Sequence, residues 1–185
     1  MNVWIRTARL ILRTVTMDDL DDVALSWRVD GPPLSREEAE TQVNWMLENH
    51  RHNAPRRVRH LCLAVIHQRD QRFVGWCGLD HLDPDRADPV LFYLLNPDYW
   101  GQGLATEAAT ALLGYAFGEL GLARVDGGAA FENSASKRVM EKIGMRYLGL
   151  NEEGGHSFTL TREEYSQDKG QKAGSASARK ESHEI

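Results

Sequence analysis

Apolar and polar positions change their spacing several times along the chain, as they do in proteins that mix strands and helices. Alternating or continuous apolar runs of strand length predict strands at 10–15, 60–66, 73–82, 90–95, 124–131, 145–150 and 156–161. Apolar residues at helical spacing predict helices at 17–27, 36–47, 104–120 and 134–143. The order is one strand, two helices, three strands, a helix, a strand, a helix and two strands. This alternation predicts an α/β or α+β sheet layered by helices.

Residues that start and stop elements support these boundaries. Ser35 and Glu38 form the S-x-x-E pattern of a capping box, which predicts the start of the second helix. Gly121 follows the third helical stretch, where a glycine commonly ends a helix. The polar turn 68–71 separates two β-prone runs and therefore predicts a hairpin.

Length and composition predict one globular domain with a tail. The chain has 185 residues, of which 42% are hydrophobic and 26% charged, and this length suffices to bury a sizeable core without disulfides or metals. Residues 166–185 lack aromatic side chains and are rich in Gly, Ala, Ser, Lys and Glu, a composition that does not offset the entropy of ordering. We therefore expect a domain at 1–165 and a disordered tail at 166–185.

Charge and cysteine usage narrow the classes of partner. The formal net charge of -5 provides no cationic surface for nucleic acid or an anionic membrane, and it suits a cationic substrate better. Cys62 and Cys77 lie in apolar runs without metal-ligand spacing, so we expect buried thiols and no metal site. Residues 1–15 do not resemble a signal peptide, and no apolar stretch approaches membrane-spanning length. These observations predict a cytoplasmic protein.

The junction 94–106 has the features of an anion-binding site. A buried strand ends there, Pro97 prevents further strand pairing, and Gly101 and Gly103 frame a turn that opens a helix near Leu104. Such a turn directs unpaired backbone N–H groups outward at the positive end of a helix dipole, without a side chain to block approach. Two glycines are also compatible with nothing more than a tight strand-to-helix turn. The anion-site interpretation predicts binding of a phosphate or pyrophosphate.

Known phosphate motifs discriminate between the possible ligands. No Gly-Lys-Ser or Gly-Lys-Thr occurs in the chain, which excludes a Walker loop. A Rossmann fingerprint fits poorly, because Thr106 occupies its third small position and Glu132 lies further on than its acidic residue usually does. The segment WGQGLA, residues 100–105, resembles the R/Q-x-x-G-x-G/A signature with which the GNAT superfamily of acetyltransferases holds the pyrophosphate of acetyl-CoA.

The resemblance extends over approximately residues 6–161. The segments NPDYWGQGLATEA, ENSASKRVMEKIGM and TARLILR, at 96–108, 132–145 and 7–13, are similar to those of the Rim-type ribosomal-protein acetyltransferases. The resemblance implies a mixed central sheet of about six to seven strands flanked by helices. It also implies a splayed strand pair that holds acetyl-CoA, and acetyl transfer to an amine within a ternary complex.

The same resemblance assigns roles to individual residues. Leu95 would contact the pantetheine arm through its backbone N–H and polarise the thioester carbonyl. Asn133 matches the residue that hydrogen-bonds the pantetheine arm, and Ser136 matches the hydroxyl near the sulfur, although both are also favoured helix-capping types. The pyrophosphate loop consists of Trp100, Gly101, Gln102, Gly103, Leu104, Ala105 and Thr106.

The catalytic groups are only partly accounted for by this resemblance. Ser136 is the candidate proton donor to the leaving thiolate, because Met140 stands where many relatives have a tyrosine. Val90 occupies the position of the family's frequent strand acid, so the general base is left to Asp80, to His81 or to a water chain. Histidine is the residue type suited to proton transfer near neutral pH, which favours His81.

We therefore predict an N-acetyltransferase that moves acetyl from acetyl-CoA to a primary amine, either a protein N-terminus or a small molecule. The alternative is a non-catalytic acyl-CoA-binding or regulatory module, which the missing strand acid and tyrosine would suit. Acidic residues of the first two helices would favour a cationic acceptor such as a polyamine, an aminoglycoside or a basic peptide N-terminus. The sequence is compatible with a monomer or a homodimer.

Overall fold

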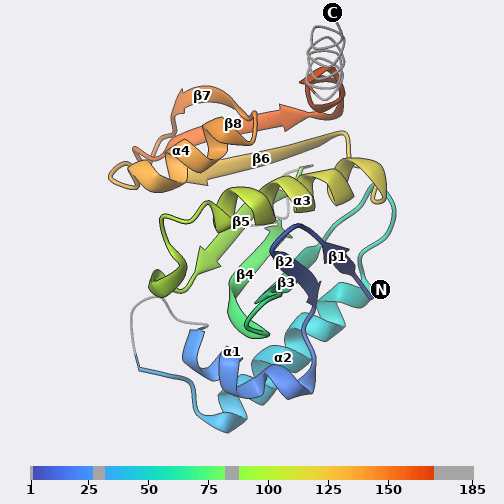
Figure 1. Ribbon diagram of the computed structural model, residues 1–185. Helices are drawn as coiled ribbons and strands as arrows, with labels where there is room; N and C mark the ends of the chain where they lie inside the picture. The colour runs from blue at the N-terminus through green and yellow to red at the C-terminus, as the bar shows by residue number, and fades with distance from the viewer. Residues whose placement is uncertain (1, 27–31, 82–87, 169–185) are drawn as a thin grey trace, which may run out of the picture.

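A single eight-stranded sheet forms the centre of the protein, in a computed structural model that describes residues 2–26, 32–81 and 88–168 (Figure 1). The strands are β1 (Trp4–Arg6), β2 (Leu10–Thr14), β3 (His60–His67), β4 (Arg72–Asp80), β5 (Val90–Leu95), β6 (Arg124–Ala129), β7 (Arg146–Leu150) and β8 (His156–Thr161). The helices are η1 (Met17–Asp19), α1 (Leu20–Ser26), α2 (Arg36–Arg51), η2 (Pro97–Tyr99), α3 (Leu104–Gly118) and α4 (Ser134–Lys142).

The sheet confirms the predicted fold class and adds one strand to it. The strand order is β1-β2-β3-β4-β5-β6-β8-β7, and every neighbouring pair is antiparallel except β5 and β6, which are parallel. The sequence pattern predicted seven strands, and the resemblance implied about six to seven. The additional strand is β1, whose three residues are too few to produce a recognisable alternation.

Two hydrophobic cores lie on opposite faces of this sheet. On one face, α1 and α2 pack against side chains such as Cys62, Ala64 and Trp76. On the other face, α3 and α4 cover a larger core that includes Leu61, Leu63 and other strand residues. Because successive strand residues point to opposite faces, neighbours such as Leu61 and Cys62 contribute to different cores. The predicted burial of both cysteine thiols is confirmed, since Cys62 and Cys77 are free and buried.

Most predicted element ends fall within two residues of the observed ones, but α2 continues to Arg51, four residues beyond its predicted end. Ser35 caps α2 by accepting from the amide of Glu38, whose carboxylate accepts from the Ser35 amide, so the predicted capping box is confirmed. Strand β6 ends at Ala129, two residues before the predicted end, and its extension is replaced by a turn. Residues 27–31 and 82–87, which include the predicted ends of the first helix and of the third strand, lie outside the described residues.

A helix runs past residue 165, the predicted end of the domain. Residues 162–168 are helical, and the Tyr165 ring packs against Phe117 of α3 with 5.0 Å between ring centroids. Of the tail predicted to be disordered at 166–185, residues 166–168 are therefore helical, and residues 169–185 lie outside the described residues. No described helix has the length and apolar character needed to cross a membrane.

His50 in α2 makes stability depend on pH. Its Nε2 accepts a hydrogen bond of 3.0 Å from the Cys62 amide, and burial together with the nearby His60 lowers its pKa from 6.5 to about 4. Between these values the unfolded chain binds more protons than the folded chain, so stability falls as the pH falls. At 1.36 kcal/mol per pKa unit, we expect His50 to remove about 3 kcal/mol of stability between pH 7 and pH 4.

Urea unfolding at several pH values measures this effect. The His50→Gln variant is the reference, because a glutamine side chain can accept from the Cys62 amide without titrating. The stability difference between the wild type and His50→Gln should shrink as the pH drops from 6.5 to 4. A difference that stays constant over this range would show that His50 does not titrate abnormally.

Candidate active site

Strands β5 and β6 part from each other soon after they begin. Their pairing comprises Val90 with Asp126 and Leu91 with Gly127, and no pairing follows although both strands continue. Because the two strands are parallel, the opening widens toward their C-terminal ends. Backbone groups of β5 beyond Leu91 are therefore left for a ligand inserted between the strands. This is the splayed pair that the resemblance predicted.

A glycine-containing loop follows β5 at the open end of this gap. The backbone has φ of +73° at Gly101 and +76° at Gly103, a left-handed conformation that glycine adopts without strain. Gly103 is the N-cap of the 15-residue helix α3. Among the described residues, no group accepts a hydrogen bond from the amides of residues 101–106. These amides lie at the positive end of α3, where they can bind a phosphate group.

Trp100 anchors the loop instead of offering its own polar atom to a ligand. Its indole N–H donates a 2.7 Å hydrogen bond to the carbonyl of Leu95, the last residue of β5. The Gln102 side chain also points back to the chain, donating to the Asp98 carbonyl at 3.3 Å. Of the predicted loop residues, Trp100 and Gln102 therefore use their side chains to hold the loop. Ligand contacts are left to the backbone amides.

Arg9 is a loop contact that sequence reasoning missed. Its Nε donates to Glu107 at 2.7 Å, and its Nη1 donates to the Gln102 carbonyl at 2.9 Å. Glu107 also accepts from the Thr7 hydroxyl at 2.6 Å. Burial opposes ionisation of Glu107, but hydrogen bonds from Thr7 and Arg9 outweigh it and hold the pKa of this carboxyl below its usual value. The guanidinium of Arg9 therefore adds a positive charge beside the free amides.

We expect Arg9→Met to weaken acetyl-CoA binding by about tenfold, since one hydrogen bond to a charged group contributes roughly 1.5–3 kcal/mol. Titration calorimetry with acetyl-CoA measures the change. Arg6→Met is the matched control, because the Arg6 side chain lies on the adjacent strand and donates to Gln68 instead of the loop. Equal affinities for the two variants would show that the charge of Arg9 plays no part in binding.

Asn133 and Ser136 lie at the start of α4, where they also cap the helix. The Asn133 side-chain oxygen accepts from the Ser136 amide at 2.9 Å. Within the described chain, nothing pairs with the side-chain NH₂ of Asn133, which is exposed. Asn133 can therefore serve as a cap and still donate to a ligand.

The hydroxyl of Ser136 contacts Tyr93, a second residue that sequence reasoning missed. The Tyr93 hydroxyl lies 2.7 Å from Ser136 Oγ and 3.2 Å from the Ser136 carbonyl. Tyr93 belongs to β5 and Ser136 to α4, so this contact bridges the two sides of the gap. Burial raises the pKa of the Tyr93 phenol more than its hydrogen bond with Ser136 lowers it. The phenol therefore keeps its proton at neutral pH and is able to donate it.

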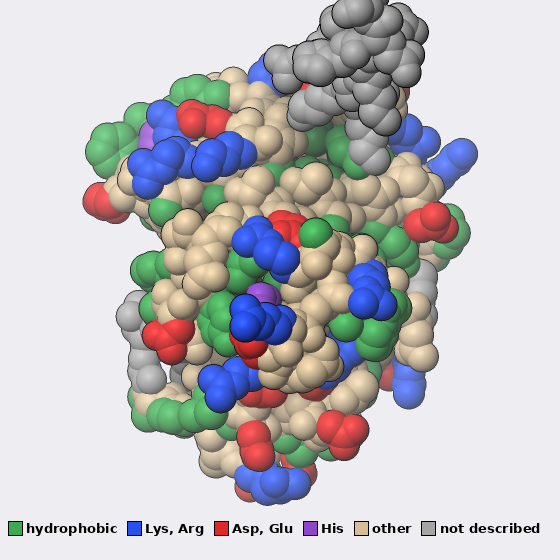
Figure 2. All heavy atoms as spheres, in the orientation of Figure 1, with side chains coloured by type: hydrophobic (Ala, Val, Ile, Leu, Met, Phe, Trp, Pro, Cys, Tyr) green, Lys and Arg blue, Asp and Glu red, His purple; other side chains and the backbone are tan. Residues whose placement is uncertain are grey.

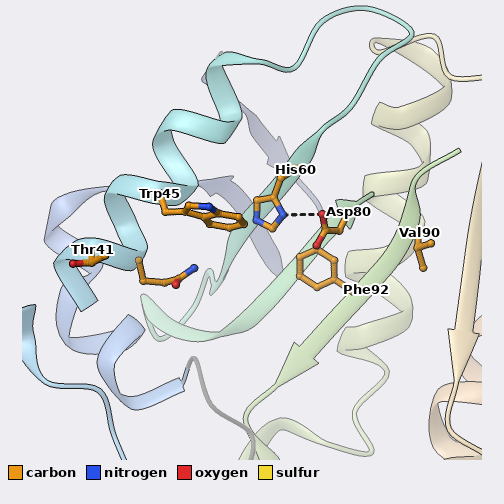
Figure 3. Close-up of a pocket in the computed structure, with 7 residues that line it drawn as sticks. Thr41, Trp45, His60, Asp80, Val90 and Phe92 are labelled. Carbon is orange, nitrogen blue, oxygen red and sulfur yellow. Dashed lines mark ion pairs between the residues drawn. The ribbon is translucent and has the colours of Figure 1, made fainter. Parts of the chain in front are cut away.

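A pocket of about 490 Å³ opens on the α2 face of the sheet, near the point where β5 and β6 part (Figure 3). It is lined by Thr41, Gln42, Trp45, His60, Asp80, Val90 and Phe92. Figure 3 shows the His60 ring between the side chains of Trp45 and Asp80, with Phe92 beside them. The pocket thus combines aromatic walls with one imidazole and one carboxylate.

Of the predicted candidates for the base, the pocket contains Asp80 but not His81. His81 is half-buried, and its backbone amide donates to the Arg59 carbonyl at 3.3 Å. The histidine beside Asp80 is His60, whose Nδ1 lies 3.2 Å from Asp80 Oδ1. Sequence reasoning missed His60 because it opens an apolar run and was counted as the first residue of a strand.

The comparisons with known proteins agree with this geometry. The family model described as Acetyltransferase (GNAT) domain matches residues 9–146. The "FsC-acetyl coenzyme A-N(2)-transacetylase" of Aspergillus fumigatus is 32% identical over 189 residues, covering 87% of this chain and 77% of that protein. The "Uncharacterized N-acetyltransferase YoaA" of Bacillus subtilis is 26% identical over 153 residues, covering 79% and 84% of the two chains.

Solved structures share the fold. The ribosomal-protein-S5-alanine acetyltransferase from Vibrio fischeri superposes with a TM-score of 0.75 at 14% identity, covering 88% of this chain and 98% of that one. The RimL ribosomal L7/L12 alpha-N-protein acetyltransferase, solved in complex with coenzyme A, superposes with a TM-score of 0.72 at 16% identity. That superposition covers 86% of this chain and 98% of RimL.

Proposed function

This chain belongs to the GNAT family of acetyl-CoA-dependent N-acetyltransferases, and from that premise we propose that it transfers acetyl directly to a primary amine in a ternary complex. The observation that carries the proposal is the gap between β5 and β6, which leads to the free amides of residues 101–106. A non-catalytic module is the less favoured alternative, since the relatives compared above are named as acetyltransferases.

In this proposal the gap holds the donor in an extended form. The pyrophosphate binds the amides of 101–106, and Arg9 adds charge beside them. The pantetheine arm follows β5 inward, hydrogen-bonding the backbone near Leu95 and the side chain of Asn133. The three residue steps from Leu95 to Phe92 span about 10 Å of strand. The thioester therefore lies near the closed end of the gap, between Phe92 and Tyr93. In this proposal Leu95 contacts the pantetheine arm but does not polarise the thioester carbonyl, a role that the resemblance had implied.

The residues at the closed end supply the chemistry that acetyl transfer needs. A neutral amine attacks the thioester carbonyl, and backbone N–H groups of β5 stabilise the oxyanion. As the carbon–sulfur bond breaks, the pair formed by Ser136 and Tyr93 protonates the thiolate of CoA. The missing family tyrosine at position 140 is thereby replaced by one from β5.

The proposed partner is a primary amine, and not nucleic acid or a membrane. The names of the compared proteins mention an N(2) position and ribosomal-protein residues, which are nitrogen acceptors. On the face drawn in Figure 2, blue basic and red acidic side chains lie interspersed, which does not favour a polyanionic partner. Two free buried thiols suit a reducing compartment, and we place the protein in the cytoplasm.

Two measurements test the proposed function. Acetyl-CoA should bind in titration calorimetry, and addition of a mixture of primary amines and peptides should release CoA thiol with one acetylated amine for each thiol. Thiol release is followed with a disulfide reagent and the products by mass spectrometry. Tight acetyl-CoA binding without any acetylated product would support the binding module and overturn the enzyme proposal.

A further inference from the structure

The pocket on the α2 face contains a buried histidine, His60, whose ring nitrogens have no hydrogen-bond partner within the described part of the chain. We infer that this pocket binds the acceptor as a small monoamine with an apolar body, and that His60 takes up the proton released by the attacking nitrogen. This inference rests on the proposed function, because it assigns the acceptor side of the same transfer.

The first argument is the state of the His60 ring. His60 is 4% exposed, and among the described residues neither Nδ1 nor Nε2 has a hydrogen-bond partner. Asp80 lies 3.2 Å from Nδ1, close enough for charge attraction but without hydrogen-bond alignment. A buried polar atom left unpaired destabilises the folded protein. A ligand nitrogen in the pocket would satisfy the ring and remove this destabilisation.

The second argument is that the ring is held firmly in place. Trp45 of α2 meets it edge to face with 4.5 Å between centroids, and Phe92 of β5 lies parallel to it at 6.2 Å. Phe92 takes this position because residue 78 on β4 is glycine, where an added Cβ would come within 2.4 Å of the Phe92 ring. A rigid imidazole with unpaired nitrogens is preorganised to accept a proton.

The third argument is the position of the pocket relative to the gap. His60 pairs with Asp80, and Asp80 pairs with Val90, so the three side chains lie in one row on one face. Val90 is also where β5 and β6 still pair, at the closed end of the gap. Phe92 points to the pocket, whereas Tyr93 points to the opposite face and reaches Ser136. A proton acceptor and a proton donor therefore lie on opposite faces of the sheet at the same place.

The lining selects the class of amine. Trp45, Val90 and Phe92 form the apolar walls of the pocket. The large aromatic side chain of Trp45 is 46% exposed and is therefore accessible to a ligand. Asp80 is the single carboxylate among the described lining residues. One carboxylate attracts one ammonium group, so a polyamine or an aminoglycoside would leave further charges against apolar walls. The pocket fits a single amine on an aliphatic or aromatic body.

The step balances as follows. The amine nitrogen forms a bond to the acetyl carbon, the carbon–sulfur bond breaks, and the thiolate takes a proton from the pair of Ser136 and Tyr93. An amine that enters as an ammonium group first gives one proton to solvent and becomes the neutral nucleophile. During attack the nitrogen loses its second proton to His60, and Asp80 stabilises the resulting imidazolium. Transfer of that proton to solvent, and return of a proton to the donor pair, restores the enzyme. The products are the acetamide and free CoA.

Kinetics with 2-phenylethylamine as the probe test the role of His60. We expect His60→Ala to lower kcat/KM for the amine by at least about 100-fold, the lower end of the range typical of general base catalysis. Acetyl-CoA affinity should change less than threefold, and added imidazole should restore activity. His67→Gln is the matched control, since His67 lies on the same strand and pairs with Asp70 at 2.8 Å far from the pocket.

Several kinetic outcomes would overturn the inference. An unchanged kcat/KM in a folded His60→Ala variant excludes the ring as the proton acceptor, as does a loss that imidazole does not reverse. A large loss in His81→Ala with none in His60→Ala assigns the base to His81 instead. A higher kcat/KM for spermidine, or for a hexapeptide with a free N-terminus, than for 2-phenylethylamine rejects the class of acceptor. In all these cases acetyl transfer itself, and thus the proposed function, stands.

An NMR measurement of 2-phenylethylamine binding tests the acceptor pocket without any acetyl transfer. In protein labelled with ¹³C at the histidine Cε1 atoms, the His60 signal is identified by its absence from His60→Gln. 2-Phenylethylamine should shift this signal with saturation, and His67 should not respond. An unmoved His60 signal at millimolar amine would overturn the pocket as an acceptor site. Loss of acetyl-CoA binding by the wild type would instead contradict the proposed function.

Discussion

Replacing Gly103 with valine should weaken acetyl-CoA binding by at least about 100-fold while the fold is retained. Gly103 has φ of +76°, a conformation in which a β-branched residue is strongly disfavoured, so valine forces the start of α3 to turn. An added Cβ would meet only the Arg9 guanidinium, at an ordinary contact distance of 3.8 Å, so the expected effect comes from the backbone conformation. Loss of two amide contacts to a charged phosphate, at roughly 1.5–3 kcal/mol each, accounts for the expected factor.

Titration calorimetry with acetyl-CoA measures this loss, and circular dichroism checks the fold. Gly118→Val is the matched control, because Gly118 is an exposed helical glycine of α3 with no heavy atom within 4 Å of an added Cβ. This control should bind acetyl-CoA as the wild type does. A folded Gly103→Val protein with wild-type affinity would show that the loop amides do not hold the pyrophosphate.

Removing the hydroxyl of Ser136 should lower kcat by about 100-fold, the contribution typical of a positioned proton donor. The CoA thiolate leaves slowly without a proton, and Ser136 and Tyr93 form one hydrogen-bonded pair at the gap. We expect Tyr93→Phe to have a similar effect. The double variant should lose little more than either single one, because groups that act as a unit are not additive.

Steady-state kinetics on the four proteins, with KM for acetyl-CoA determined separately, distinguishes catalysis from binding. Ser134→Ala provides the control, since Ser134 begins the same helix and its side chain is exposed. A loss in Ser136→Ala that appears in KM alone would make this hydroxyl a pantetheine contact. Multiplicative losses in the double variant would mean that the two hydroxyls act separately.

Local patterns in the sequence were enough to predict the donor side of the site. The capping box of Ser35 and Glu38 and the two glycines of the loop depend on residues only a few positions apart. Their physical consequences, a helix start and exposed amides, follow from backbone geometry alone. The resemblance added Asn133 and Ser136, which the structure places at the start of α4; their roles stay predictions.

The acceptor side could not be predicted because it depends on strand register. At the turn, His67 pairs with Arg72, and counting back along a regular hairpin would place His60 opposite Leu79. An irregularity between Val65 and Ile66 shifts the register by one residue and places His60 opposite Asp80 instead. A shift of one residue also changes which side chains share a face.

Contacts between distant segments escaped prediction for a related reason. Arg9 reaches Glu107 across 98 positions of sequence, and Tyr93 reaches Ser136 across 43. Neither pair has a spacing that reveals it in the linear chain. Packing of α3 against β2 and β5 brings Arg9 to Glu107, and the fold places α4 across the gap from β5, where Ser136 meets Tyr93.

The division of the interior into two cores has a consequence for how such enzymes diversify. In the proposed acceptor pocket, substitutions in α2 change the wall around the amine, while the core that supports α3 and the loop 101–106 lies on the other face of the sheet. Substitutions that change the acceptor can therefore accumulate on one side of the sheet while the acetyl-CoA-binding residues on the other side stay unchanged. Libraries for directed evolution toward a new amine are best confined to α2, the start of β3 at His60 and the end of β4 at Asp80.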